Sequence, residues 1–413
     1  MTIAEIDTPV APLDDYVSIV GCTEIEELRT LAERLRGKSV QMVNSTAVGG
    51  GVAEMLSQAV PLLQEIGLDV RWDVMSGSAP FFEVTKAFHN ALHGAPYTAR
   101  DSDFDIYMET TRRNLSRLHL DSEFTVIHDP QPAALIEGRP AGTNHWIWRC
   151  HIDLSHPNQR VWEFLDRFVA RYDGAMFSTP AFARGLAIPQ YLFYPSIDPL
   201  SEKNRELDPA YVRSVVERYG IDPARPILTQ ISRFDRLKDP VGVVRAYRLV
   251  KRFHDCQLVL AGGSATDDPE GGTVLAEVRD AAGDDPDIHL LELPPSAPLE
   301  VNALQRASTV VIQKSLREGF GLTVAEALWK KKPVVASAVG GIPVQVIHGH
   351  TGLLAHSIEG CAYQIRLLLM HPEMAARLGE NGREHVREGL LITSSVKRFL
   401  TLFLHRLQQG RRT

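Results

Sequence analysis

The residues of this chain best suited to chemistry are two glutamates that flank a short glycine turn. Glu318 and Glu326 lie either side of the Gly-Phe-Gly turn 319–321, after the apolar run 309–312 and before the apolar residues 327–329. This order predicts a strand, a tight loop and then the N-terminus of a helix. Such a helix start offers unpaired backbone N–H groups and a partial positive charge, which suit a diphosphate. Carboxylates beside it can accept hydrogen bonds from sugar hydroxyls.

The spacing E-x7-E, with G-F-G inside it, resembles the donor-site signature of retaining glycosyltransferases of the GT-B fold. The resemblance implies that Glu318 is a catalytic residue and that the following residues bind the donor: Gly319, Phe320, Gly321, Leu322, Thr323 and Glu326. Two other interpretations stay open. Thr323 and Glu326 also have the spacing of a capping box, and Glu318 could be a solvated loop residue.

A basic loop at 232–238 is the second candidate for donor chemistry. Arg233 and Lys238 follow the expected first strand of a second domain. An arginine fork and a lysine point charge can together neutralise a leaving diphosphate. The R-x4-K spacing matches that of retaining GT-B enzymes, which implies a catalytic role for both residues. The alternative is a solvated loop whose cations pair with Asp235 and Asp239.

Three glycines at 49–51 follow a predicted strand and precede a predicted helix. Glycine lets a backbone approach a ligand closely, and a helix N-terminus favours phosphate. By the resemblance, this loop closes over donor phosphate and acceptor, and we expect Gly50 and Gly51 to bind the donor. An ordinary flexible turn is the alternative.

Two polar segments of the first half could bind the acceptor. The turn 128–132 (H-D-P-Q-P) carries His128, Asp129 and Gln131, and its prolines stiffen it. A carboxylate and an amide suit a sugar rich in hydroxyls, so these three residues are predicted to bind the acceptor. After the next strand, Asp153 is predicted to do the same. His151 falls where retaining GT-B enzymes keep a histidine near the transferred sugar, which implies a catalytic role, although a lone histidine is more often structural.

Four motifs make the resemblance narrower: H-D-P-Q-P, W-R-C-H-I-D at 148–153, Q-K-S-x-R-E-G-F-G-L-T at 313–323, and V-G-G-I-P at 339–343. Together they resemble the trehalose glycosyltransferring synthases over residues 37–387. The resemblance implies a retaining, reversible transfer of glucose from a nucleoside-diphosphate glucose to free glucose, giving α,α-trehalose, and a homodimer.

Three rivals remain. A retaining trehalose phosphorylase would use phosphate or glucose 1-phosphate, and it would have no ribose for Glu326 to hold. A sugar-nucleotide epimerase of the GT-B fold belongs to a different class and needs no acceptor site. A catalytically silent binding protein is disfavoured because both cations and both glutamates are present.

The pattern of apolar segments predicts the architecture. Strands alternate with helices in each half, which indicates an α/β protein of the GT-B type, with two doubly wound Rossmann-like domains facing across a cleft. We expect an acceptor-side domain at 1–197, a nucleotide-sugar domain at 198–390, and a C-terminal helix at 391–413 that packs back on the first domain.

Composition narrows the class of protein. The 413 residues are 44% hydrophobic and 23% charged, and the net charge of -7 argues against nucleic-acid binding. The four cysteines lack C-x-x-C spacing, and neither a signal segment nor a membrane span is visible. We therefore expect a cytoplasmic protein without a tightly bound cofactor. No motif requires Mg²⁺, and the D-x-D spacing at 101–103 reads as a helix cap or surface loop.

Overall fold

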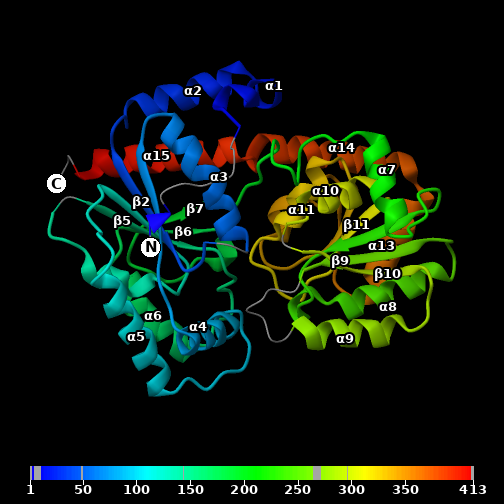
Figure 1. Cartoon of the computed structure of the whole chain (residues 1–413), viewed down its shortest axis with the longest axis horizontal. Coiled ribbons are helices and arrows are strands. Elements are labelled where there is room, and N and C mark those ends of the chain that lie inside the picture. The colour runs from blue at the N-terminus through cyan, green and yellow to red at the C-terminus, as the bar shows by residue number, and fades with distance from the viewer. Residues whose placement is uncertain are drawn as a thin grey trace. The chain divides into compact units, whose positions relative to one another are not determined.

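The computed structural model describes residues 2–3, 11–47, 50–142, 144–263, 271–294 and 296–410. The chain forms two compact units, Met1–Ser196 with Ile392–Thr413, and Ile197–Leu391. Each unit is built on a parallel sheet with helices on both faces (Figure 1). The predicted α/β class with two doubly wound sheets is confirmed.

The sheet of the first unit has the order β1-β3-β2-β4-β5-β6-β7 and is parallel except for β1, which runs antiparallel to β3. Its strands are β1 (Thr2–Ile3), β2 (Ser39–Asn44), β3 (Asp69–Val74), β4 (Phe124–His128), β5 (His145–Cys150), β6 (Gly174–Phe177) and β7 (Gln190–Leu192). The order reverses between β2 and β4. In sheets of this kind, ligands bind beyond the carboxyl ends of the strands at such a point.

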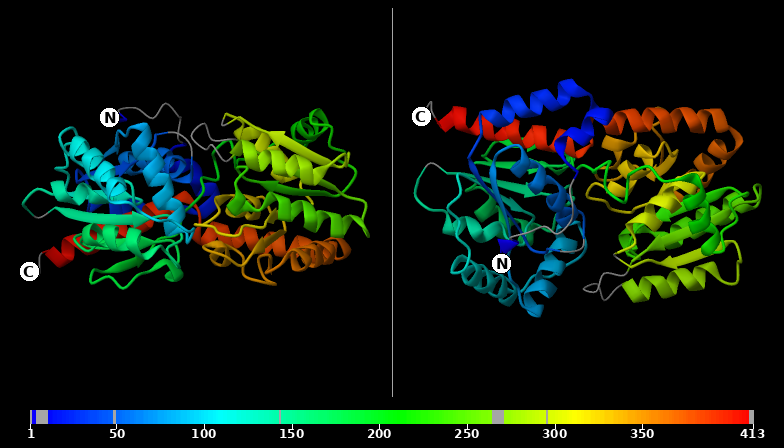
Figure 2. Two further views of the ribbon diagram at one scale, coloured as in Figure 1. Left: turned by 90° about the horizontal axis from the view of Figure 1, so that it is seen from below. Right: turned by 45° about the horizontal axis from the view of Figure 1, so that its top comes forward.

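Helices cover both faces of this sheet (Figure 1). One face carries α2 (Cys22–Glu33), α3 (Gly51–Glu65) and α15 (Ile392–Gly410), with α1 (Val17–Val20) beside α2; the other carries α4 (Ala79–Leu92), α5 (Asp101–Leu115) and α6 (Gln159–Val169). The C-terminal α15, red in Figure 2, lies along α2. Short 3-10 turns are η1 (Leu13–Tyr16), η2 (Ala133–Gly138) and η3 (Pro180–Phe182).

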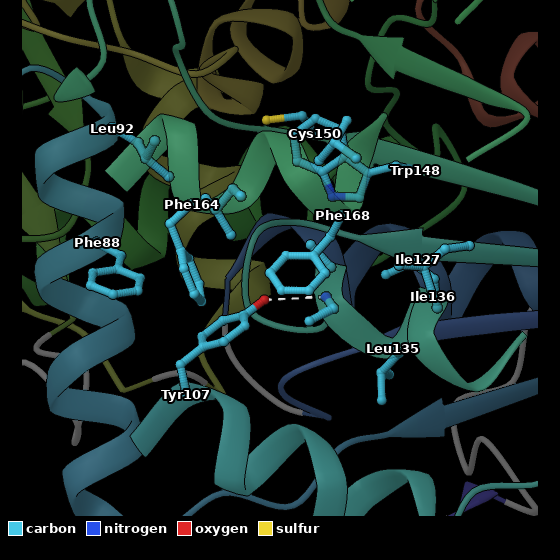
Figure 3. Close-up of a cluster of buried hydrophobic side chains, with 14 of the residues drawn as sticks. Phe88, Leu92, Tyr107, Ile127, Leu135, Ile136, Trp148, Cys150, Phe164 and Phe168 are labelled. Atoms are coloured by element: carbon cyan, nitrogen blue, oxygen red, sulfur yellow. Dashed lines mark hydrogen bonds between the residues drawn. The ribbon is translucent and has the colours of Figure 1, made fainter. Parts of the chain in front are cut away.

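An aromatic core under α4, α5 and α6 anchors the turn that follows β4. The rings of Phe88, Tyr107 and Phe164 gather there (Figure 3), with Tyr107 and Phe164 edge to face at 5.3 Å. The buried Tyr107 hydroxyl donates to the Pro130 carbonyl at 2.6 Å and accepts from the Ala134 N–H at 3.3 Å. The core therefore fixes the backbone next to the predicted acceptor residues.

The sheet of the second unit has the order β10-β9-β8-β11-β12-β13 and is parallel throughout its described strands. They are β8 (Ile227–Ile231), β9 (Gln257–Gly262), β10 (Ile288–Glu292), β11 (Val310–Gln313), β12 (Val334–Ser337) and β13 (Leu353–Ala355). Its order reverses between β8 and β11.

Strand β9 is buried on both faces, as expected of a central parallel strand. Leu258 and Leu260 pack in one cluster with α8 (Pro240–Lys251), α9 (Gly271–Ala282) and α13 (Ile358–Met370). Val259 and Ala261 pack in the other cluster with α7 (Pro209–Arg218) and α10 (Pro298–Ala307). The remaining helices are α11 (Leu322–Trp329), α12 (Ile342–Gln345) and α14 (Pro372–Gly389). None of the helices in the described ranges is long and apolar enough to cross a membrane.

One lysine of the basic run 330–332 belongs to the interior of the second unit. The run follows the end of α11, and Lys330 is 5% exposed. Its ammonium donates to Asn204 Oδ1 at 2.9 Å and to Gln305 Oε1 at 2.8 Å. Burial lowers the pKa of Lys330 to about 7, against the raising effect of the Glu326 charge. In the sequence, nothing distinguishes the buried Lys330 from the two lysines that follow it.

Candidate active site

The first cluster of polar side chains lies at the carboxyl edge of the second unit's sheet. β8 and β11 are neighbours where the strand order reverses, and the loops after them carry Lys238 and Glu318. Lys238 Nζ donates to both carboxylate oxygens of Glu318, at 2.8 and 2.6 Å. The two side chains are 19% and 7% exposed, so the pair is largely shielded from water. The fold thus brings together two residues that the sequence predicted separately.

Two further hydrogen bonds hold the carboxylate of Glu318 in place. Gln313 Nε2 and Ser315 Oγ donate to its Oε2 atom at 3.2 and 3.1 Å. The oxygen of the Gln313 amide accepts a hydrogen bond from Thr323 Oγ1 at 3.2 Å. Gln313 therefore joins the carboxylate to the first turn of α11. Our sequence analysis gave Gln313 no role, although it ends the buried β11 strand immediately before the loop.

Arg233 belongs to the same loop as Lys238, ahead of the 3-10 turn η4 (Arg236–Lys238). Its side chain is 49% exposed, and its Nη2 atom lies 3.8 Å from Asp235 Oδ2. Asp235 also caps η4 by accepting from the Leu237 N–H at 2.7 Å. Arg233 therefore does lie near Asp235, as the alternative interpretation required. Its guanidinium is nevertheless half-exposed, so a diphosphate can reach it.

Two glycines shape the loop that carries Glu318. Gly321 has φ +81° and is the residue immediately before α11, so the helix start predicted at Leu322 is confirmed. Gly340 has φ +56°, and a Cβ added there would lie 1.6 Å from the Glu318 carbonyl oxygen. The V-G-G-I-P turn at 339–343 thus packs against the backbone of the loop that carries Glu318, closely enough to leave no room for a Cβ at Gly340.

The loop and helix start that were predicted to bind the donor are partly open. Leu322 and Thr323 are half-buried, and so are Gly319 and Gly321, whereas Phe320 is buried. No cap hydrogen bond from a side chain is found at this helix, whose cap residue is Gly321. The capping-box interpretation of Glu326 is therefore wrong.

Glu326 lies deeper than expected, with 1% of its surface exposed. Its Oε1 atom is 3.6 Å from Lys203 Nζ, and Gln305 Nε2 donates to its Oε2 atom at 3.5 Å. With 1% of its surface exposed, Glu326 is out of reach of a ribose in this conformation.

The predicted glycine loop after β2 is described only in part. Gly50 is exposed, has φ +81° and is the residue before α3, which begins at Gly51. This strand–loop–helix order agrees with the expectation. Gly49 lies outside the described residues.

The second cluster lies at the carboxyl edge of the first unit's sheet, after β4 and β5. Asp129 follows β4 with φ +71°, a conformation that is uncommon for residues other than glycine. The His151 N–H donates to its Oδ1 atom at 2.8 Å, and Trp148 Nε1 donates to its carbonyl at 3.0 Å. Burial raises the pKa of Asp129 to about 7. Asp129 therefore links the ends of β4 and β5.

His128 and His151 form a pair beside Asp129. His128 Nδ1 lies 3.0 Å from His151 Nε2, and the two rings are nearly parallel, at 11°. Burial, followed by the charge of Arg149, lowers the pKa of each ring well below its usual value near 6.5. Both rings are therefore neutral at physiological pH.

Arg149 is a buried cation that our sequence analysis did not single out. It is 4% exposed, and its guanidinium lies 4.3 Å from the ring centre of Phe193. Burial lowers its pKa to about 9. A single charge inside the otherwise apolar run 145–150 was the signal that could have identified it.

The other predicted acceptor residues differ in accessibility. Gln131 is half-buried, and its Oε1 atom is buried without a hydrogen-bond partner in the described part of the chain. Such an acceptor is normally satisfied by protein, water or ligand. Asp153 and His128 are only 3% and 0% exposed, which contradicts direct contact with a sugar in this conformation. Asp153 instead accepts from the Ser155 N–H at 2.8 Å and shapes the turn after β5.

The D-x-D segment at 101–103 forms the start of α5. Asp103 accepts from the Arg100 N–H at 2.9 Å, so its interpretation as a helix cap is confirmed. Among the described residues, no group of three or more His, Cys, Asp or Glu side chains has the arrangement of a metal site.

Family models match both halves of the chain. Residues 42–184 match the model described as trehalose synthase, N-terminal domain, and residues 214–385 match glycosyl transferases group 1. The trehalose synthase of Pyrococcus horikoshii is 44% identical over 97% of this chain and 98% of its own length. That of Rubrobacter xylanophilus is 46% identical, over 95% and 96%. The chain belongs to the trehalose synthase family.

More distant relatives of the family include the trehalose phosphorylase of Pleurotus pulmonarius, which is 30% identical over 91% of this chain and 58% of its own length. Among solved structures, sucrose-phosphate synthase from Thermosynechococcus elongatus superposes with a TM-score of 0.71 at 17% identity, over 90% of this chain and 100% of that chain. The trehalose-6-phosphate synthase OtsA gives 0.71 at 14% identity, over 90% and 99%. The predicted GT-B fold is confirmed, and the chain is a trehalose-related glycosyltransferase.

Proposed function

We propose that this enzyme transfers glucose, with retention, from a nucleoside-diphosphate glucose to free glucose and so forms α,α-trehalose. The observation that carries the proposal is the Lys238–Glu318 pair at the carboxyl edge of the second unit, with Arg233 on the same loop. The full-length likeness to proteins named trehalose synthase supports it.

In this proposal, the cluster around Lys238 and Glu318 acts mainly by stabilising negative charge. When the bond from the anomeric carbon to the donor oxygen breaks, the diphosphate gains negative charge. Lys238, Arg233 and the N-terminus of α11 would stabilise that charge. Glu318, itself held by Gln313 and Ser315, keeps the Lys238 ammonium in position. We infer a front-face reaction in which the acceptor hydroxyl passes its proton to the leaving diphosphate. This chemistry needs no carboxylate pair of the glycosidase type.

Recognition of the acceptor falls to the cluster of the first unit. Glucose is neutral, so hydrogen-bonding groups that are themselves mostly neutral suit it. Asp129 and His151 are both half-buried, and the His151 N–H donates to Asp129 Oδ1. The Gln131 Oε1 atom has no hydrogen-bond partner among the described residues. We propose that these three residues contact sugar hydroxyls and that Glu326 holds the donor ribose after a change of conformation that exposes it.

A product assay with two substrate pairs tests the function. The purified enzyme is incubated with UDP-glucose or ADP-glucose plus glucose, and separately with glucose 1-phosphate plus glucose. We expect α,α-trehalose, identified by its anomeric NMR signals, from the first pair. Trehalose from glucose 1-phosphate alone would make the enzyme a phosphorylase. A change of the sugar nucleotide without any disaccharide would make it an epimerase.

A further inference from the structure

The two histidines beside Asp129 share one hydrogen bond, and the proton in it can belong to either ring. The bond joins Nδ1 of His128, at the end of β4, to Nε2 of His151, directly after β5. A neutral imidazole has one N–H donor and one acceptor nitrogen. The ring that donates in this bond therefore decides which nitrogen of its neighbour carries the remaining proton.

The surroundings of His128 indicate which of the two rings donates the hydrogen bond. The residue is 0% exposed, and its Nε2 atom is buried without a hydrogen-bond partner among the described residues. A buried N–H group without an acceptor is rarer in proteins than an unsatisfied acceptor. Arg149, which pairs with His128 in the register of β4 and β5, adds a positive charge that acts on the ring. That charge disfavours a further proton on the ring, so His128 is neutral and its Nε2, which has no partner in the described part of the chain, carries a lone pair.

His128 therefore carries its proton on Nδ1 and donates it to His151 Nε2. Because His151 accepts at Nε2, its own proton is on Nδ1. The backbone of His151 is held at the same time by Asp129 Oδ1, at 2.8 Å. His128 is fully buried, whereas His151 is half-buried and can reach a ligand.

We propose that His128 is a positioning residue that holds His151 in the tautomer protonated on Nδ1, so that His151 offers an N–H donor to the bound sugar. The tautomer follows from the pair together with the buried surroundings of His128. Only the use of the N–H toward sugar rests on the proposed function. His128, predicted from the sequence to touch the acceptor, would thus act through its neighbour.

Nitrogen NMR of histidine-labelled enzyme tests the tautomer without any activity measurement. The His151 signals are identified as those missing from His151→Gln. We expect the pattern of a neutral ring protonated on Nδ1. A wild-type His151 ring protonated on Nε2, or a charged ring at pH 7, would overturn the proposal. The tautomer is read from the wild-type spectrum, so this test does not depend on the folding of any variant at residue 128.

Two variants at residue 128 separate positioning from packing. His128→Asn places an amide N–H close to the former Nδ1 and should keep the His151 pattern, whereas His128→Phe keeps an aromatic ring without a donor and should give mixed tautomers. Transfer should fall about tenfold more in His128→Phe than in His128→Asn, as expected for one hydrogen bond of ordinary strength. An unchanged His151 pattern in folded His128→Phe would contradict the mechanism. A correct pattern with no transfer in the wild type would contradict the proposed function only.

Discussion

The two polar clusters both lie at the carboxyl edge of their sheets but differ in charge. In the second unit the cluster follows β8 and β11, between which the strand order reverses; in the first unit it follows β4 and β5, next to the reversal between β2 and β4. In the second unit, Lys238 and Glu318 form an ion pair. In the first unit, burial raises the pKa of Asp129 to about 7 and keeps His128 and His151 uncharged.

This difference matches the two substrates that we propose. A diphosphate is strongly charged, and its charge grows as the donor bond breaks, so a cationic loop and a helix start suit it. Free glucose carries no charge, and it is recognised by hydroxyl hydrogen bonds to groups with fixed directions. The carboxyl edges of the two sheets therefore differ in electrostatics: we propose that one stabilises charge and that the other orients a neutral sugar.

The largest expected effect comes from removing a cation of the charged cluster. Lys238→Ala or Arg233→Ala should lower turnover by about 10²- to 10³-fold, or ~3 to 4 kcal/mol, as for the loss of one oxyanion donor. Steady-state kinetics on variants with an unchanged circular dichroism spectrum measure this. Arg236→Ala is the matched control, because Arg236 is on the same loop but pairs at the surface with Glu277. Near-normal rates in Lys238→Ala would remove this cluster from the chemistry.

The next largest effect concerns the backbone under the charged cluster. Gly340→Ala would place a Cβ against the Glu318 carbonyl oxygen and should cost about 3 kcal/mol of stability from overlap and backbone strain. Gly349→Ala is the control, because Gly349 also has a positive φ, +77°, but open space around it. It should cost only about 1 kcal/mol. Equal losses in thermal or urea unfolding would show that the close approach does not matter.

A smaller and selective effect is expected in the neutral cluster. Asp129→Ala should raise the glucose concentration needed for half-maximal rate by about tenfold, the value of one charge-assisted hydrogen bond. Dependence on the nucleotide sugar should change little. Asp121→Ala, which removes an exposed carboxylate paired with Arg71, serves as control. An unchanged glucose response in Asp129→Ala would show that this carboxylate does not bind the acceptor.

A last effect, also in the neutral cluster, is a dependence of stability on pH. The pKa of Asp129 is about 7 in the folded protein, above its usual value of 3.8, so the folded state holds this proton more tightly than the unfolded chain does. The resulting stabilisation is complete below about pH 4 and is lost as the pH rises to about 7. Asp129→Asn has no such proton but keeps an oxygen for the His151 N–H. Its melting temperature should rise relative to wild type across this interval. A constant difference would contradict the raised pKa.

Features that depend on residues close together in the sequence could be predicted from it. Strands alternate with helices in both units, as the pattern of apolar segments predicted. Lys238 and Glu318 were found from motifs. The three-residue strands β7 and β13 were missed, because a run of that length shows no periodicity.

The contacts that give each cluster its charge state could not be predicted, because they depend on the register between distant strands. His128 is buried and stands opposite Arg149 only after β4 and β5 pair, and burial followed by the Arg149 charge lowers the pKa of both histidines. The burial of Glu326 likewise depends on Lys203, 123 positions earlier in the chain, and on the α10 residue Gln305.

Titration calorimetry of nucleotide binding tests most directly whether the Lys238 cluster binds the donor and the Asp129 cluster the acceptor. UDP and ADP are each titrated into wild-type enzyme, Lys238→Ala and Asp129→Ala, without any acceptor sugar present. The account predicts that Lys238→Ala weakens binding of the recognised nucleotide by at least about tenfold, since it removes a charge-assisted contact, and that Asp129→Ala binds it like the wild type. Equal weakening in both variants, or in neither, would contradict the assignment of donor and acceptor to the two clusters.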